Sequence, residues 1–208
     1  MTKFLAVFLD KFGVKDMRKK LFPLTIVILM LLNWLPLCLA KSTLPVQKQT
    51  VLGLYVTAKE AYEMWLADKN RIKILDVRTP EEYIFIGHAP MAQNIPFQLF
   101  NYKMAVRNKG PLMKANPNFI TEVVQKFKKS DTILVICRSG NRSAAAVNAM
   151  ATAGFKSAYS ITDGFEGDRV RDPSSPFYGK RFKNGWRNSG ISWTDKLNPE
   201  LMWIPAGP

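Results

Sequence analysis

Cys137 has the clearest chemical potential in this sequence, because of the segments on either side of it. The apolar, β-branched run 132–136 predicts a buried parallel strand. The alanine-rich stretch 144–147 predicts a helix. The thiol therefore lies on a tight turn between a strand and a helix N-terminus. Backbone N–H groups converge at such a turn and the helix dipole favours negative charge there. The spacing predicts a reactive cysteine beside an anion-binding loop.

Two fixed positive charges strengthen this interpretation. Arg138 and Arg142 lie within five residues of the cysteine, with Gly140 between them, and an electropositive loop favours the thiolate over the thiol. The alternative is a buried, inert cysteine that packs as a small apolar side chain. The other cysteine of the chain, Cys38, lies in a segment that we expect to be removed. A single remaining cysteine excludes an intramolecular disulfide framework.

The N-terminal segment resembles a secretory signal. Residues 21–40 carry no charge, follow the basic run 18–20 and precede Lys41. This pattern predicts a signal peptide over residues 1–40, cleaved after Ala40, and a periplasmic or secreted mature protein. The alternative is an uncleaved anchor, which would place the protein at a membrane.

Details of the same segment refine this prediction. Pro23, Asn33 and Pro36 shorten the apolar run below a comfortable membrane span. Lipid attachment at Cys38 is a third option, weakened by the absence of small residues before it. The long basic region makes Met17 an alternative start of translation.

Composition limits the classes of partner. Residues 41–208 suit one domain. The formal net charge of the chain is +14, which attracts small anions, acidic proteins or anionic membranes, or simply gives a solvated basic surface. No nucleic-acid motif is present, so no nucleic-acid partner is expected. One histidine and one mature cysteine exclude the usual zinc ligand sets, and we predict neither a metal nor another cofactor.

The elements alternate between strands and helices. Thr57 and Thr79 begin capping boxes, and the first of these helices is predicted to reach Ala67. Asn116 is predicted to cap a helix that reaches about Lys128. Strands are predicted at 72–77, 93–96, 132–137 and 158–161, a helix at about 142–153, and a polar linker at 41–50. Together these elements predict an α/β fold with a mostly parallel sheet and helices on both faces. Ligands of such sheets bind beyond the carboxyl ends of the strands, where Cys137 lies.

Two other catalytic classes find little support. His88 is the only histidine, and a Cys–His pair would need it near Cys137. A structural histidine that bonds the backbone is the favoured interpretation. The chain has no Gly-x-Ser-x-Gly sequence, so serine hydrolase chemistry is not indicated.

Three stretches of the chain together resemble the rhodanese, or thiosulfate sulfurtransferase, domain family. Residues 75–96 look like its N-terminal signature, 137–143 like its active-site loop, and 163–167 with 185–191 like its C-terminal end. The similarity covers roughly residues 53–193. It implies a rhodanese-like fold with a five-stranded parallel sheet, here within a domain spanning residues 51–208.

The resemblance also implies a reaction. Cys137 would take a sulfane sulfur from a small anionic donor such as thiosulfate, form a persulfide, and pass the sulfur to a thiophilic acceptor. The implied substrate-binding residues are Arg138, Ser139, Gly140, Asn141, Arg142 and Ser143, through their backbone amides and the two positive charges. Arg142 could instead be structural and pair with Asp76 or Glu82, which with Arg78 would then be scaffold residues.

The chain departs from the family in one place, an insertion at about 168–184 that is rich in proline and basic residues. It could overhang the site, contact a partner, or be a decorated surface loop. The leading function is a secreted sulfurtransferase. The alternative is a non-catalytic or redox-sensing module that binds an acidic protein partner through this insertion.

Phosphatases and arsenate reductases of the same fold have a longer loop, with an arginine six positions after the cysteine. Here Arg142 follows Cys137 by five positions, and Ser143 holds the sixth. The shorter loop makes a smaller cradle, which favours sulfur over phosphate.

Overall fold

The computed structural model describes residues 44–107 and 112–205. The predicted signal peptide and the alternative start at Met17 lie outside these residues. The described residues belong to one compact unit that begins at Thr43. Within the two described ranges, none of the helices combines the length and the apolar content needed to cross a membrane.

A five-stranded sheet forms the centre of the unit, and every neighbouring pair in it is parallel. The strand order is β1-β7-β6-β2-β3, so β6, the strand before the cysteine loop, is central. The strands are β1 (Tyr55–Val56), β2 (Ile72–Asp76), β3 (Gln93–Asn94), β6 (Thr132–Ile136) and β7 (Ala158–Ile161). The predicted parallel α/β architecture is confirmed.

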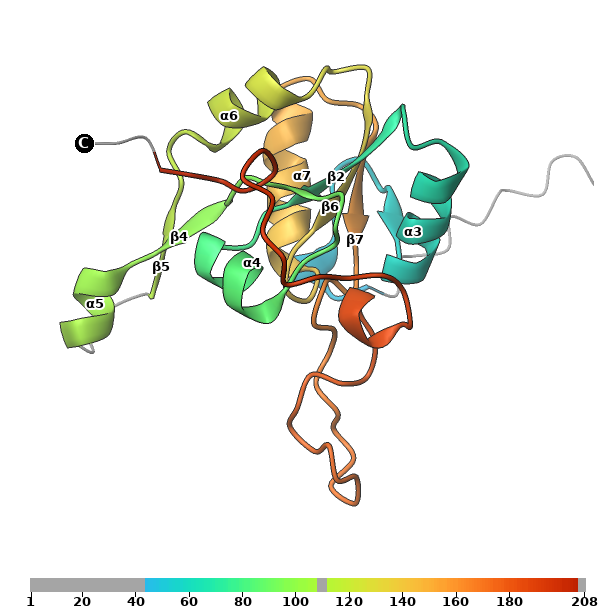
Figure 1. Cartoon of the computed structure of the whole chain (residues 1–208), viewed down its shortest axis with the longest axis vertical. Helices are drawn as coiled ribbons and strands as arrows, with labels where there is room; N and C mark the ends of the chain where they lie inside the picture. Colours follow the sequence, from blue (N-terminus) through green and yellow to red (C-terminus); the bar gives the residue numbers. More distant parts are fainter. Residues whose placement is uncertain (1–43, 108–111, 206–208) are drawn as a thin grey trace, which may run out of the picture. The chain divides into compact units, whose positions relative to one another are not determined.

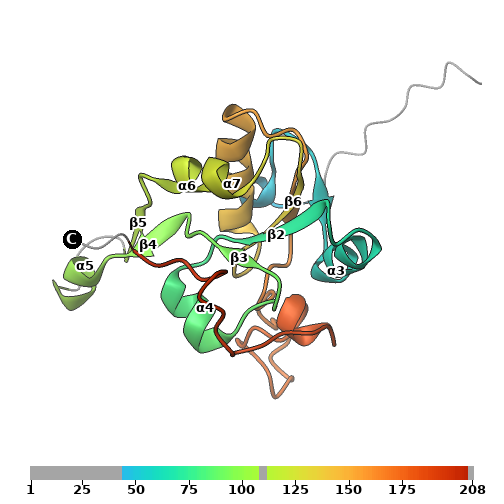
Figure 2. The same cartoon turned by 45° about the horizontal axis from the view of Figure 1, so that its top comes forward.

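Helices cover both faces of this sheet (Figure 2). They are α3 (Ala58–Ala67), α4 (Pro80–Ile86), α6 (Phe119–Lys126) and α7 (Asn141–Thr152). Alternate residues of β6 divide between the two cores: Ile133 and Val135 pack with α6 and α7, and Leu134 and Ile136 with α3. All four are fully buried, and each contributes roughly 1.5–3 kcal/mol of hydrophobic stabilisation. The double-sided core holds β6, and hence its carboxyl end, in a fixed position.

Both predicted capping boxes are present. The Thr57 side chain accepts a hydrogen bond from the N–H of Glu60, and Thr79 accepts one from Glu82. Each glutamate in turn accepts from the backbone N–H of its threonine. Two N–H groups that would otherwise lack partners are satisfied at each helix start, which fixes where α3 and α4 begin.

The predicted start of α6 is wrong. The helix begins at Phe119, with Asn118 rather than Asn116 at the cap position, because Pro117 and Asn118 form a turn first. Asn116 is instead buried and holds the turn: its Oδ1 accepts from the N–H of Asn118 at 3.0 Å, and its Nδ2 donates to the carbonyl of Pro96 at 2.9 Å.

Three elements were not predicted. Strands β4 (Gln98–Phe100) and β5 (Met113–Ala115) form a separate antiparallel pair, and α5 (Tyr102–Arg107) lies between them in the sequence. They extend from the central sheet near α4 (Figure 1). None of these elements contributes to the cysteine loop.

Two segments flank the carboxyl end of the sheet. Part of the predicted linker forms a short 3₁₀ helix, η1 (Val46–Lys48). The insertion leaves the domain as the orange loop at the bottom of Figure 1. Backbone bridges pair Arg169 with Arg181 and Val170 with Tyr178, so the insertion folds back on itself. It returns to a second 3₁₀ helix, η2 (Trp186–Asn188), whose Trp186 is fully buried.

Candidate active site

Cys137 follows the last residue of β6 directly, four positions before α7 begins. Its side chain is buried, with 1% of the residue exposed. The carbonyl of Cys137 accepts a hydrogen bond of 2.7 Å from the N–H of Phe165, which ties the start of the loop to the segment after β7. The thiol therefore has a fixed position that only a small reacting group can approach.

The loop supplies the thiol with polar neighbours. The N–H of Gly140 donates to Sγ of Cys137 at 3.1 Å, and the thiol donates to Oγ of Ser143 at 3.6 Å. Gly140 has a φ of 99°, and a Cβ at this position would lie 2.1 Å from the carbonyl oxygen of Thr162. Only glycine fits this conformation and this contact. The N–H of Gly140 is thus held where it stabilises negative charge on the sulfur.

Ser143 lies beneath the loop and is fully buried. Its Oγ donates to the carbonyl of Gly140 at 3.0 Å and lies 3.0 Å from Oγ of Ser160. The hydroxyl therefore connects the thiol to the loop and to β7. Among the predicted substrate-binding residues, Ser143 contacts the thiol through its side chain and does not face solvent.

Arg142 pairs with a carboxylate, which is the structural alternative of the two that the sequence left open. Its Nη1 and Nη2 donate to the two carboxylate oxygens of Glu82, at 2.6 and 2.7 Å. Both side chains are largely buried, with 14% and 16% exposed. Burial alone would raise the pKa of Glu82, but the hydrogen bonds and charge of Arg142 outweigh it and hold the pKa below its usual range. This ion pair connects the first turn of α7 to α4.

Replacing Glu82 with glutamine is expected to lower the free energy of unfolding by about 2–3 kcal/mol at pH 7, because the buried Arg142 loses its carboxylate. A carboxyl group with a lowered folded-state pKa contributes stability above its unfolded pKa of about 4.3 and loses it as the pH falls through the folded value. The difference between variant and wild type should therefore shrink in acid, below about pH 4. Urea denaturation at neutral and acidic pH measures both effects.

Glu63→Gln, at an exposed position of α3, provides the matched control. It should change stability little at either pH. An equal loss for the two variants would show that the contact between Glu82 and Arg142 does not hold α7.

A second buried ion pair supports the other side of the site. Asp76, the last residue of β2, accepts from Arg78 through Nη2 at 2.6 Å, and neither side chain is exposed. The Arg78 guanidinium also donates to the carbonyl of Gly87 at 2.8 Å and lies 4.1 Å from the ring centre of Phe165. Phe165 is the residue whose N–H holds the Cys137 carbonyl. The pair thus connects the end of β2 with Gly87 and with the segment that contains Phe165.

His88 makes no hydrogen bond with Cys137 among the described residues. It is buried, stacks on the ring of Tyr83 with centroids 3.7 Å apart, and places Nδ1 3.2 Å from the Tyr83 carbonyl. Burial lowers its pKa despite that hydrogen bond. The structural interpretation of this histidine agrees with these contacts.

Three of the predicted site residues remain available at the surface of the loop. Arg138 and Asn141 are exposed and Ser139 is half-buried. The backbone carbonyl of Arg138 accepts from the N–H groups of Glu166 and Gly167. Its side chain makes no ion pair with any carboxylate in the part of the chain that the structure describes. Arg138 is therefore an exposed positive charge of the loop without an ion-pair partner among the described residues.

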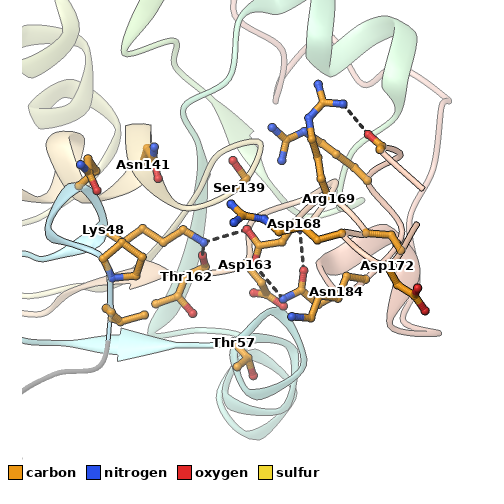
Figure 3. Close-up of a pocket in the computed structure, with 18 of the residues that line it drawn as sticks. Lys48, Thr57, Ser139, Asn141, Thr162, Asp163, Asp168, Arg169, Asp172 and Asn184 are labelled. Carbon is orange, nitrogen blue, oxygen red and sulfur yellow. Dashed lines mark hydrogen bonds and ion pairs between the residues drawn. The ribbon is translucent and has the colours of Figure 1, made fainter. Parts of the chain in front are cut away.

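A cleft that the sequence did not predict lies beside the loop (Figure 3). Ser139 and Asn141 from the loop, Lys48 from η1 and Asp168 from the insertion line it. Lys48 crosses it and donates through Nζ to the carbonyl of Thr162 at 2.8 Å and to Asp168 at 3.1 Å. The insertion thus lies beside the loop and lines the same cleft. Only the basic composition of 168–184 signalled this in the sequence.

Comparison with known proteins places these residues in context. The family model of the rhodanese-like domain matches residues 57–169. The chloroplastic thiosulfate sulfurtransferase 16 of Arabidopsis thaliana is 37% identical over 111 residues, which cover 53% of this chain and 82% of that protein.

A second relative and a solved structure are also similar to this chain. The senescence-associated protein DIN1 of Raphanus sativus is 40% identical over 93 residues, which cover 45% of this chain; the chain thus spans about half of DIN1 (46%). The crystal structure of Rv0390 from M. tuberculosis matches with a TM-score of 0.54 and 27% identity, over 68% of this chain and 96% of that one.

Proposed function

Because the chain belongs to the rhodanese-like domain family, we propose that it is a sulfurtransferase that carries a sulfane sulfur as a persulfide on Cys137. The observation that carries this proposal is the contact between Sγ of Cys137 and the N–H of Gly140, in a loop whose Arg138 has no carboxylate partner among the described residues. A cysteine held in this way can be both a nucleophile and a sulfur carrier.

The first half-reaction loads the cysteine. The Cys137 thiolate attacks the outer sulfur of thiosulfate, a new S–S bond forms, and sulfite leaves with the electron pair of the bond that breaks. The charged terminal sulfur of the persulfide then lies in the cradle of the loop, where the N–H of Gly140 stabilises it. Arg138 attracts the donor, which carries two negative charges.

The second half-reaction returns the enzyme to its starting state. A thiophilic acceptor such as cyanide attacks the terminal sulfur, and the Cys137 thiolate leaves with the electron pair of the S–S bond. The product with cyanide is thiocyanate. The two steps together consume no oxidant or reductant, so the reaction needs no redox cofactor.

The direct test is thiocyanate formation by the purified protein from thiosulfate and cyanide. We expect ping-pong kinetics, in which sulfite forms before the acceptor binds. Absence of turnover from thiosulfate or any other sulfane donor would contradict the proposal. Robust hydrolysis of an aryl phosphate that depends on Cys137 would instead support the phosphatase class.

Arg138→Ala is expected to raise the KM for thiosulfate about tenfold or more, with a smaller effect on kcat. Interactions with a charged group contribute roughly 1.5–3 kcal/mol, and each 1.4 kcal/mol is a factor of ten. Initial rates at low ionic strength measure both constants. Lys103→Ala, which removes an exposed charge on α5, is the control and should leave them unchanged. Unchanged kinetics in Arg138→Ala would show that this side chain points away from the donor.

We also propose that residues 1–40, which the structure does not describe, direct export of the protein and are removed. The intact mass of the protein recovered outside the cytoplasm should then equal that of a chain that begins at Lys41. Full-length protein found only in membranes would favour the anchor.

A further inference from the structure

The cleft beside the cysteine loop has a volume of about 1350 Å³. Segments that are distant in the sequence line it: the region of η1, the loop after Cys137, the insertion, and also Thr57 and residues 162–163 (Figure 3). Pockets that enclose small ligands usually measure about 300–1,000 Å³. The cleft is therefore larger than a small sulfur donor or acceptor requires, and its volume can hold a segment of polypeptide.

The insertion gives this cleft a positive wall. Residues 168–184 contain five Lys or Arg and two Asp. Arg169 and Arg181 are held by backbone carbonyls, of Gly179 and Gly167 respectively. Neither makes an ion pair with a carboxylate among the described residues, so hydrogen bonding orients their charges without neutralising them.

These charges are also close to the reactive loop. Burial lowers the pKa of Arg181, and the neighbouring charges of Arg138 and Arg169 lower it further. Arg138 belongs to the loop that follows Cys137, so the positive wall continues from the insertion to the cysteine loop. Glu166 and Asp168 offset part of this effect, but the crowded positive charges still favour an anionic ligand with several charges.

The cleft has three acidic side chains against five basic ones, and each of the three has a hydrogen-bond or ion-pair partner. Asp168 accepts from Lys48, and Asp172 accepts from Ser174. Asp163 accepts from the N–H groups of Ala58 and Gly185, at 2.8 and 3.0 Å. Arg171 and Lys183 also line the cleft and add to its positive charge.

We propose that this cleft binds an extended acidic peptide segment of the protein that accepts the sulfur, and so brings an acceptor thiol to the persulfide of Cys137. The inference rests on the proposed sulfur transfer. It names the class of the acceptor as a protein thiol flanked by carboxylates. Selection occurs through the insertion, which is the part of this chain that departs from the family pattern.

The experiment uses the full chain and three synthetic peptides that differ only in their flanking residues, which are all Glu, all Gln or all Lys. Each peptide is made with a central Ser, to measure binding alone, and with a central Cys, to measure sulfur transfer. We expect the Glu peptide with Ser to bind at least about tenfold more tightly than the Gln peptide. We expect the same order in kcat/KM for the Cys peptides.

Arg171→Gln combined with Lys183→Gln should reduce the preference for the Glu peptide about tenfold. The matched control is Lys103→Gln with Lys114→Gln, which removes the same net charge at exposed positions outside the cleft and should keep the preference. Thermal melting verifies the fold of each variant, and Arg171→Gln alone serves if the double variant unfolds.

Each outcome decides a separate claim. The docking proposal would be overturned if the three peptides bound equally, or if the cleft and control variants lost the preference equally. It would also be overturned if the protein, tested against vesicles of anionic lipid, bound only to those vesicles. If the Ser peptides show the Glu preference but no sulfur reaches any acceptor, cyanide included, docking stands and the proposed reaction fails. If cyanide accepts sulfur and the peptides show no preference, the reaction stands and docking fails.

Discussion

Replacing Cys137 with alanine is expected to reduce thiocyanate formation from thiosulfate and cyanide about a thousandfold or more, because the side chain that carries the sulfur is lost. The fold should remain, since alanine fits the space of the buried thiol and the ion pairs around the loop do not involve the sulfur. Steady-state kinetics measure the loss, and circular dichroism with thermal melting verifies the fold.

Ser143→Ala is the informative control for this variant. It removes the hydroxyl 3.6 Å from the sulfur but keeps the nucleophile, so measurable turnover should remain. Substantial activity in Cys137→Ala would show that another group carries the sulfur, and the assignment of the nucleophile would be wrong.

The largest loss of stability is expected from Asp76→Asn, about 3–5 kcal/mol in the free energy of unfolding. The carboxylate is the only ion-pair partner of Arg78 among the described residues, and both side chains are completely buried. The substitution leaves the guanidinium with its charge uncompensated in the interior. Urea denaturation with two-state analysis measures the change.

Asp68→Asn is the matched control, because Asp68 pairs with Arg71 at 3.7 Å on the surface, where Arg71 is 88% exposed. Exposed pairs of this kind contribute less than about 1 kcal/mol. Similar losses in the two variants would contradict the role of the buried pair as the scaffold behind the cysteine loop.

Features encoded by neighbouring residues were predictable from the sequence. The capping boxes at Thr57 and Thr79 involve residues three positions apart, and the strand-loop-helix arrangement around Cys137 is contained in about twenty consecutive residues. The start of α6 was not predicted correctly. Asparagine is a common N-cap residue, but Asn116 instead contacts the carbonyl of Pro96, and this contact between distant residues cannot be read from the local sequence. Strands β4 and β5 have three residues each, too few to show a periodic pattern.

The parts of the site that depend on tertiary contacts were only partly predictable. Two roles were open for Arg142, and the contact that decides between them joins residues 60 positions apart. The contact of Lys48 with Thr162 spans 114 positions, and no local signal in the predicted linker pointed to it. The basic cleft arises only when η1, the loop and the insertion come together, so composition indicated its charge but not its place.

The most direct test of the central claim is mass spectrometry of the protein after incubation with thiosulfate and removal of the excess. The proposed mechanism predicts the added mass of one sulfur atom on the peptide that contains Cys137, no added sulfur on any other peptide, and loss of that mass when cyanide is added. Thiocyanate formation without any sulfur on Cys137, or stable sulfur on another residue alone, would contradict the persulfide mechanism.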